Sequence, residues 1–201
     1  MRILPAGDRA LLVELADLDE VLGYYAALAA APPADVVDIV PAARTVLVTT
    51  RGSLEVLSRS LLAVTPADGS RSAGSLLELP VTYDGEDLRD VARMLSCSVD
   101  EVIARHCGEE WTVAFCGFSP GFGYLTGAGE WDIARRESPR TKVPAGAVAL
   151  AGEFSGVYPR ESPGGWQLIG RTTVRIFDQD RDPAALFHPG RRVRFVDAGR
   201  G

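Results

Sequence analysis

A change in pattern near His106 constrains the fold of this chain more than any other feature. Before it, stretches with apolar residues at helical spacing alternate with short β-rich runs, and after it helical patterns nearly vanish. Many short strands joined by turns rich in glycine and proline are typical of a β-barrel or sandwich. The predicted strands of this second part are at 111–118, 147–151, 166–169, 174–177 and 192–196.

The first part of the chain predicts a small α+β sandwich. The order of its segments is ββαββα, which places two helices on one face of a sheet. The predicted elements are two strands joined by a turn within 3–14, a helix at 17–30, a hairpin of 36–40 and 45–49, and a helix at 53–64.

A stretch rich in proline, glycine and serine, at 65–75, predicts a linker between the two parts. We therefore expect two domains, 1–74 and 75–201. The second begins with a strand at 76–83 and a helix at 86–95. Ser98 with Glu101 forms a capping box that starts a further helix to His106.

Composition bounds the functional classes. Of 201 residues, 46% are hydrophobic and 24% are charged, which is typical of a globular protein and excludes disorder. The lack of an apolar run of about 18 residues argues against a membrane span, and the early turn at Gly7-Asp8 argues against a signal peptide, so we expect a cytoplasmic protein. The net charge of −6 argues against a nucleic-acid partner.

Charge is unevenly distributed along the chain. Residues 131–201 hold 12 basic and 8 acidic side chains, although the whole chain is acidic. An anionic ligand would be favoured near this region. The alternative is that acidic helices simply lie in the N-terminal part.

The residues that usually bind metals and phosphates are sparse. The cysteines are Cys97, Cys107 and Cys116, without C-x-x-C spacing, and there are two histidines, so we expect no metal site and no disulfide. Lys142 is the only lysine and follows no phosphate-binding glycine loop. A Walker-type ATP site in this chain is thereby excluded.

The stretch from Gly117 to Leu125 contains a G-x-S-x-G pattern. A hydrolase would use Ser119 as its nucleophile, but the next residue, Pro120, has no N–H to donate to an oxyanion. The favoured interpretation is a type II turn with Pro120 and Gly121 at its centre. Such a turn would present Phe122 and Tyr124 to a cavity, unless both aromatics belong to the core.

Two further features suggest a site. Arg140, Arg160 and Arg171 lie in turn-rich segments and could together bind a carboxylate or phosphate, or form separate surface salt bridges. His106 could act as a general acid or base beside Glu109 or Glu110, or interact with the C-terminal end of its helix. His188 is expected to be structural.

Three blocks together resemble a known family: Phe118–Leu125, Pro139–Val148 and Gly156–Thr172. They are similar to the allophanate hydrolase subunit 1 family, which includes the B subunit of 5-oxoprolinase and the kinase inhibitor KipI. The resemblance implies a ferredoxin-like α+β N-terminal domain followed by a mainly-β, cyclophilin-like barrel. It also implies a substrate pocket lined by Phe122, Tyr124, Arg140, Pro144, Tyr158, Arg160, Ser162, Trp166 and Arg171, with His106 as the candidate catalytic residue.

The resemblance further implies a function that depends on partners. In 5-oxoprolinase, such a subunit works with a second cyclophilin-like subunit and a further catalytic subunit to convert 5-oxoproline to glutamate with ATP. A related pair in urea carboxylase acts on urea and carboxybiotin. On this basis the chain itself binds no cofactor, and ATP is used by the complex. The alternative is a regulator that inhibits a sensor histidine kinase; prolyl isomerisation would rest on fold analogy alone.

Three positions depart from the family pattern. Gly123 replaces a common proline, Ala147 a common serine, and Phe154 the glutamine of a G-x-Q-T-G loop. A phenyl ring offers neither the donors nor the acceptor of an amide. If that glutamine contacts substrate, this chain binds a different or less polar one.

Overall fold

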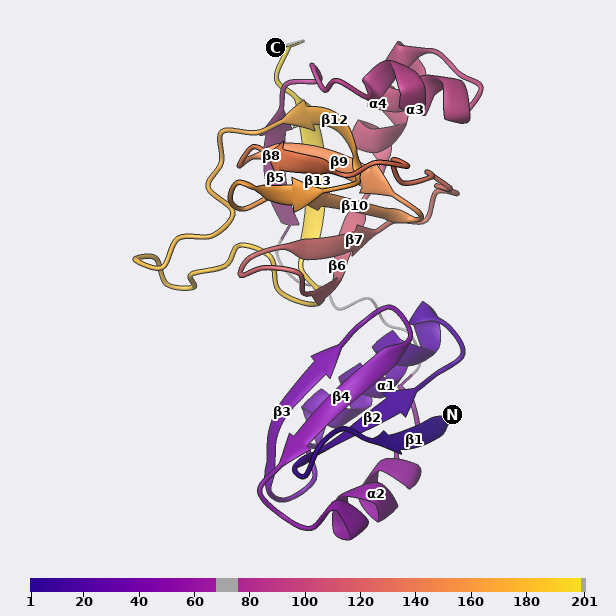
Figure 1. The fold of residues 1–201 in the computed structure, drawn as a ribbon, viewed down its shortest axis with the longest axis vertical. Coiled ribbons are helices and arrows are strands. Elements are labelled where there is room, and N and C mark those ends of the chain that lie inside the picture. The colour runs from indigo at the N-terminus through magenta and orange to yellow at the C-terminus, as the bar shows by residue number, and fades with distance from the viewer. Residues whose placement is uncertain (68–75, 200–201) are drawn as a thin grey trace. The chain divides into compact units, whose positions relative to one another are not determined.

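A computed structural model describes residues 1–67 and 76–199 and divides the chain into two compact units, Met1–Arg71 and Ser72–Gly201 (Figure 1). The domain boundary expected at 74 lies outside the described residues. Among the described residues, no helix is both long and apolar enough to cross a membrane. Each unit has its own core, and each is described separately.

The N-terminal unit has the expected ββαββα order. Its four strands form an antiparallel sheet in the order β1-β2-β4-β3, with both helices on one face (Figure 1). The elements are β1 Arg2–Pro5, β2 Ala10–Glu14, α1 Leu18–Ala30, β3 Val36–Pro41, β4 Thr45–Thr50 and α2 Leu54–Leu62. The α+β architecture is thus present, while the finer description as ferredoxin-like stays a prediction.

Alternation along the strands explains the single core of this unit. Val46 and Val48 of β4 and Val13 of β2 point to one face, where they pack against Tyr24 of α1 and Leu61 of α2. The Tyr24 hydroxyl donates a hydrogen bond to the carbonyl oxygen of Leu61, 2.7 Å away, which ties the two helices together. The polar tip of the buried tyrosine is therefore satisfied.

The second unit is a nearly closed barrel. Seven strands follow the order β12-β9-β10-β7-β6-β13-β5, and a small two-stranded sheet of β8 and β11 lies apart from them. The barrel strands are β5 Leu76–Val81, β6 Trp111–Cys116, β7 Gly123–Thr126, β9 Ala147–Ala151, β10 Phe154–Val157, β12 Gln167–Arg171 and β13 Arg192–Asp197. The remaining elements are α3 Leu88–Met94, α4 Val99–Gly108, β8 Arg140–Val143 and β11 Ser162–Gly164.

A short seam joins the two ends of the seven-stranded sheet. Thr82, just after β5, exchanges two backbone hydrogen bonds with Arg171 of β12, at 2.8 and 2.9 Å. The N–H groups of Gly85 and Asp87 then donate to the carbonyl oxygens of Ile169 and Leu168. Helices α3 and α4 pack together at one end of the barrel (Figure 1), and α4 begins with the predicted Ser98–Glu101 capping box.

The two faces of the barrel strands build two different apolar clusters. Inward-facing side chains from all seven strands, with residues of α3 and α4, form the main core. Outward-facing residues of β7, β9, β10 and β12, together with a residue of β8 and residues that flank the strands, form a second cluster, which we call the outer aromatic cluster. Its members are Phe122, Val143, Ala147, Ala149, Ala151, Tyr158, Trp166 and Leu168, with Tyr124 and Phe154 at its edge.

The predicted strand at 174–177 is wrong. In the structure Phe177 makes only an isolated bridge, with Ala185. The guanidinium of Arg181 instead donates hydrogen bonds to the carbonyl oxygens of Arg175, Ile176 and Ala184. A side chain thus satisfies the backbone that a neighbouring strand would otherwise pair. Strands β7, β8, β10 and β11 were missed because they lie inside segments rich in glycine and proline.

Candidate functional site

The glycine-rich stretch after β6 forms the predicted type II turn. The Phe122 N–H donates to the Ser119 carbonyl oxygen at 3.0 Å, and Gly121, with φ +83°, occupies the position that needs a left-handed backbone. The turn places Phe122 in the core, where it is 1% exposed, and leaves Tyr124 half-buried. Phe122 is therefore a core residue, which is the second of the two interpretations that the sequence allowed.

Phe122 is the centre of the outer aromatic cluster. Its ring makes edge contacts with Tyr124, Tyr158 and Trp166 at centroid distances of 5.1 to 5.3 Å. Gly164 makes this packing possible, because a Cβ there would lie 2.3 Å from the Tyr158 hydroxyl oxygen. Edge-to-face packing of this kind stabilises a fold by about 0.5–1.5 kcal/mol per pair beyond burial.

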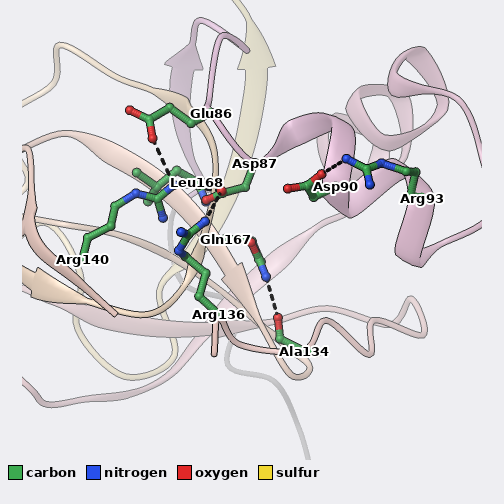
Figure 2. A network of polar contacts seen from close by, with 9 residues as sticks. All are labelled: Glu86, Asp87, Asp90, Arg93, Ala134, Arg136, Arg140, Gln167 and Leu168. Carbon is green, nitrogen blue, oxygen red and sulfur yellow. Dashed lines mark hydrogen bonds and ion pairs between the residues drawn. The ribbon is translucent and has the colours of Figure 1, made fainter. Parts of the chain in front are cut away.

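Asp87 is the hub of an ion-pair network at the barrel seam (Figure 2). Its Oδ1 accepts hydrogen bonds from Arg136 and Arg140, each at 2.8 Å, and its Oδ2 accepts one from the backbone N–H of Leu168 at 2.7 Å. Burial by itself would raise the pKa of Asp87, but hydrogen bonds from Arg140 and Leu168 and the charges of the two arginines lower it. Asp87 is therefore a buried, fully compensated carboxylate.

The three arginines expected to share an anion site have separate environments. Arg140 binds Asp87 and also Glu86, at 3.1 Å, whereas the Nε of Arg171 binds Asp84 at 2.8 Å. Arg160 is exposed, and its carbonyl oxygen accepts from the Ser162 hydroxyl. Arg140 and Arg171 therefore fit the alternative of separate salt bridges. The acidic run Asp84–Asp87 was the sequence signal that could have revealed their partners.

A cavity of about 750 Å³ opens beside the barrel. Two of the predicted pocket residues, Tyr158 and Arg171, line it, together with the segment from Thr172 to Asp180 that sequence reasoning had taken partly as a strand. Arg171 and Arg175 bring positive charge to its wall, and Arg175 pairs with Asp178 at 3.0 Å. The cavity wall therefore combines aromatic side chains with two ion-paired guanidinium groups and the carboxylates of Asp178 and Asp180.

The other predicted pocket residues lie outside the lining of this cavity. Trp166 is buried in the outer aromatic cluster, Pro144 is exposed, and Ser162 belongs to β11. Their expected contact with substrate stays a prediction.

His106 lies inside the main core. It is 0% exposed, with Nδ1 2.7 Å from the Tyr83 hydroxyl and Nε2 2.9 Å from the Ser155 hydroxyl. Its ring stacks on Phe195 at 4.3 Å, and burial lowers its pKa to about 3. Both ring nitrogens lie within hydrogen-bond distance of a hydroxyl group and are shielded from solvent. His106 therefore fits a structural role, and this geometry gives no support to the predicted acid–base role.

The acids expected to assist His106 have other partners. Both carboxylate oxygens of Glu109 accept backbone N–H groups, from Ala128 at 2.7 Å and Gly129 at 2.9 Å. Glu110 binds Arg192 on β13. Within the described ranges, no three histidine, cysteine or acidic side chains gather as a metal site would require.

Comparisons with known proteins agree with this barrel. The family model for the carboxyltransferase domain, subdomains C and D, matches residues 1–187, and the chain therefore belongs to that family. The chain is 44% identical over 125 residues to the B subunit of 5-oxoprolinase from Bacillus subtilis (strain 168) and 45% identical over 129 residues to that of Escherichia coli O157:H7. These matches cover 60% and 62% of this chain but only 52% and 59% of the relatives.

Solved structures with a similar fold include members of known sequence similarity to this chain. TTHA0988 is 36% identical, with a TM-score of 0.79 over 94% of this chain and 40% of its own. The uncharacterized protein PH0987 from Pyrococcus horikoshii is 37% identical, with a TM-score of 0.59 over 99% of both chains. The urea amidolyase of K. lactis, at 19% identity, shares the fold, with a TM-score of 0.76 over 98% of this chain and 15% of its own.

The structure accounts for two departures from the family pattern. Gly123 faces the barrel interior, where a Cβ would lie 3.0 Å from Phe187, so the phenyl ring occupies the space of a larger residue. Phe154 makes edge contacts with Phe115 at 5.6 Å and Tyr124 at 5.7 Å. An aromatic contact therefore stands where the pattern has an amide.

Proposed function

We propose that this chain is a non-autonomous, cytoplasmic subunit of an ATP-dependent 5-oxoprolinase-type complex, which opens the ring of 5-oxoproline to give glutamate. One observation carries the proposal. The chain belongs to the carboxyltransferase C and D family and is 42–45% identical to three proteins named as the B subunit of 5-oxoprolinase. The name of those relatives implies an enzyme of several subunits.

The cavity offers chemistry that suits this substrate. A lactam with a carboxylate needs a cationic group for the anion and an apolar wall for the ring. Arg171 supplies the cation, and Tyr158, Ile176 and Phe177 supply apolar and aromatic surface. Asp84 binds the Nε of Arg171, and we propose that the terminal nitrogens of this guanidinium bind the ligand carboxylate.

A need for partner subunits follows from the same cavity. Its described lining includes arginines and aspartates but neither histidine nor cysteine, and His106 is shut inside the core. The aspartates of the lining could act as general bases, but we propose that the groups which bind and hydrolyse ATP lie outside this chain. We propose that a second cyclophilin-like subunit and a third, catalytic subunit supply them.

The test is a pull-down of the tagged chain from its own host, followed by measurement of 5-oxoproline-dependent ADP and glutamate formation. We expect activity in the complex and none in the isolated chain. Activity of the isolated chain would refute the dependence on partners. A captured complex that leaves 5-oxoproline unchanged, or a histidine kinase as the captured protein, would refute the substrate assignment.

A matched pair of variants links the activity to the cavity. Arg171→Ala should still assemble but should raise KM for 5-oxoproline at least about tenfold, since a hydrogen bond to a charged group contributes about 1.5–3 kcal/mol. Arg194→Ala removes a half-exposed arginine of β13 that pairs with Glu78 away from the cavity. That variant should keep wild-type activity.

A further inference from the structure

The hairpin tip between β6 and β7, residues 117–122, borders the cavity at two points. The ring of Phe118 makes an edge contact with the ring of Tyr158, at a centroid distance of 6.2 Å. Gly121 lies directly against Phe177, because a Cβ on this glycine would be 2.5 Å from the Phe177 Cβ. Tyr158 and Phe177 both line the cavity, so the hairpin tip packs against two lining residues without itself belonging to the described lining.

Phe118 has a backbone conformation that is unfavourable for its side chain. Its φ is +66°, and the Ser119 N–H donates to the Gly117 carbonyl oxygen at 2.7 Å, so Phe118 is the central residue of a tight γ-turn. The other described non-glycine residues with positive φ are Asp35 and Ser96. Short polar side chains tolerate this region better than a bulky aromatic does.

The same side chain is poorly placed for stability of the fold. Phe118 is 57% exposed, whereas Phe122, four residues further and in edge contact with it at 5.4 Å, is almost fully buried. A strained backbone combined with an exposed aromatic ring contributes little to folding, and such conformations cluster at ligand-binding sites. The features of Phe118 are therefore better explained by contact with something that binds to the protein.

The chemistry around the hairpin tip indicates what binds. Arg171 and Arg175 contribute guanidinium groups to the cavity wall, beside Asp178 and Asp180, and Tyr158 and Phe177 make another part of the wall aromatic. A small, flat molecule with a carboxylate satisfies both, because its charge can face an arginine and its ring can lie against an aromatic side chain. A long aliphatic or polycationic ligand satisfies neither.

We propose that Phe118 is a ligand-contacting residue, whose ring covers one face of a small, flat-ring carboxylate bound in the cavity. The inference deepens the proposed function, since 5-oxoproline is a small-ring carboxylate whose lactam group is planar. The tight turn holds the ring in place before the ligand arrives. No rearrangement of the hairpin tip is then required on binding.

Two variants separate the ring from the backbone. Phe118→Ala and Phe118→Gly both remove the ring, but only glycine adopts positive φ without strain. Both should raise the Kd of the full-length chain for 5-oxoproline and for furan-2-carboxylate about three- to tenfold, the range expected for one aromatic contact. Propionate, which has the charge without the ring, should bind equally to wild type and both variants. Phe118→Tyr should restore ring-dependent binding.

Stability provides the second readout. Phe118→Gly should unfold at a higher urea concentration than Phe118→Ala, because it relieves the strain that alanine retains. Met94→Ala removes another exposed apolar side chain, from α3, and should leave the binding of all three carboxylates unchanged.

The possible outcomes are distinct. Wild-type affinity for the flat carboxylates in both Phe118 variants would overturn the inference, as would a lack of binding by the wild-type chain, or loss of subunit assembly with ligand affinity retained. A complex that is inactive on 5-oxoproline, combined with Phe118-dependent binding of furan-2-carboxylate, would refute the proposed function and leave this inference supported.

Discussion

The buried His106 predicts a specific pH dependence of stability. Burial lowers its pKa from 6.5 to about 3 in the folded chain, whereas in the unfolded chain it titrates near its ordinary value. Between these two values the unfolded state binds one more proton than the folded state, so stability falls as the pH falls. The stabilising contribution is fully present above the unfolded pKa and is lost progressively toward pH 3.

The magnitude follows from the two pKa values. From pH 7.5 to pH 5.0, protonation of the unfolded histidine should lower the free energy of unfolding by about 2 kcal/mol, at 1.36 kcal/mol per pH unit below 6.5. His106→Gln removes the titrating group and retains hydrogen-bonding capacity toward Tyr83 and Ser155. The difference in stability between wild type and this variant should therefore shrink by that amount over the same interval.

Urea unfolding monitored by tryptophan fluorescence measures this difference. All tryptophans of the chain lie in the second unit, and two of them, Trp111 and Trp131, contact the His106 ring. The signal therefore reports the unit that holds His106. Equal slopes in wild type and His106→Gln would refute the reasoning.

Three further changes test the packing and charge arguments. Asp87→Ala should destabilise the second unit by about 3 kcal/mol, because Arg136 and Arg140 lose their shared partner; urea unfolding measures the loss, and near-wild-type stability would contradict the network. Gly164→Ala should cost about 1–3 kcal/mol, because the new methyl group would displace Tyr158, with a change in near-UV circular dichroism as the readout. Asp84→Asn should keep the seam but weaken 5-oxoproline binding a few-fold, because the guanidinium of Arg171 would lose the ion pair that holds it in position. Unchanged affinity would show that Asp84 does not contribute to the site.

Local features of the fold were predictable because their causes are local. The Ser98–Glu101 capping box needs residues three apart, and the turn at Pro120-Gly121 needs only two central residues. The seam and its ion pairs were not predictable in this way. Arg140 and Asp87 lie 53 positions apart, and their pairing depends on how the barrel closes. Sequence alone therefore suggested an anion site where the structure has a salt bridge.

The roles of the candidate site residues also depend on contacts between distant parts of the chain, which the sequence does not show. The glycine- and proline-rich blocks drew attention because such loops often shape pockets, yet Gly164 and Trp166 serve the outer aromatic cluster. His106 was singled out because histidine is chemically versatile, but nothing in the sequence showed that Tyr83 and Ser155 would enclose it. Burial, which the sequence gives only indirectly, separates the residues that maintain the fold from those that can meet a ligand.

Exposure also decides which part of the glycine-rich stretch is available for binding. Ser119 is the centre of the G-x-S-x-G pattern, but its hydroxyl is buried without a hydrogen-bond partner, so the pattern produces no nucleophile. The same turn buries Phe122 and leaves Phe118 in solvent at positive φ. A stretch that resembles a hydrolase motif in sequence thus places two aromatic rings in edge contact, at a centroid distance of 5.4 Å, with one ring buried in the core and the other largely exposed.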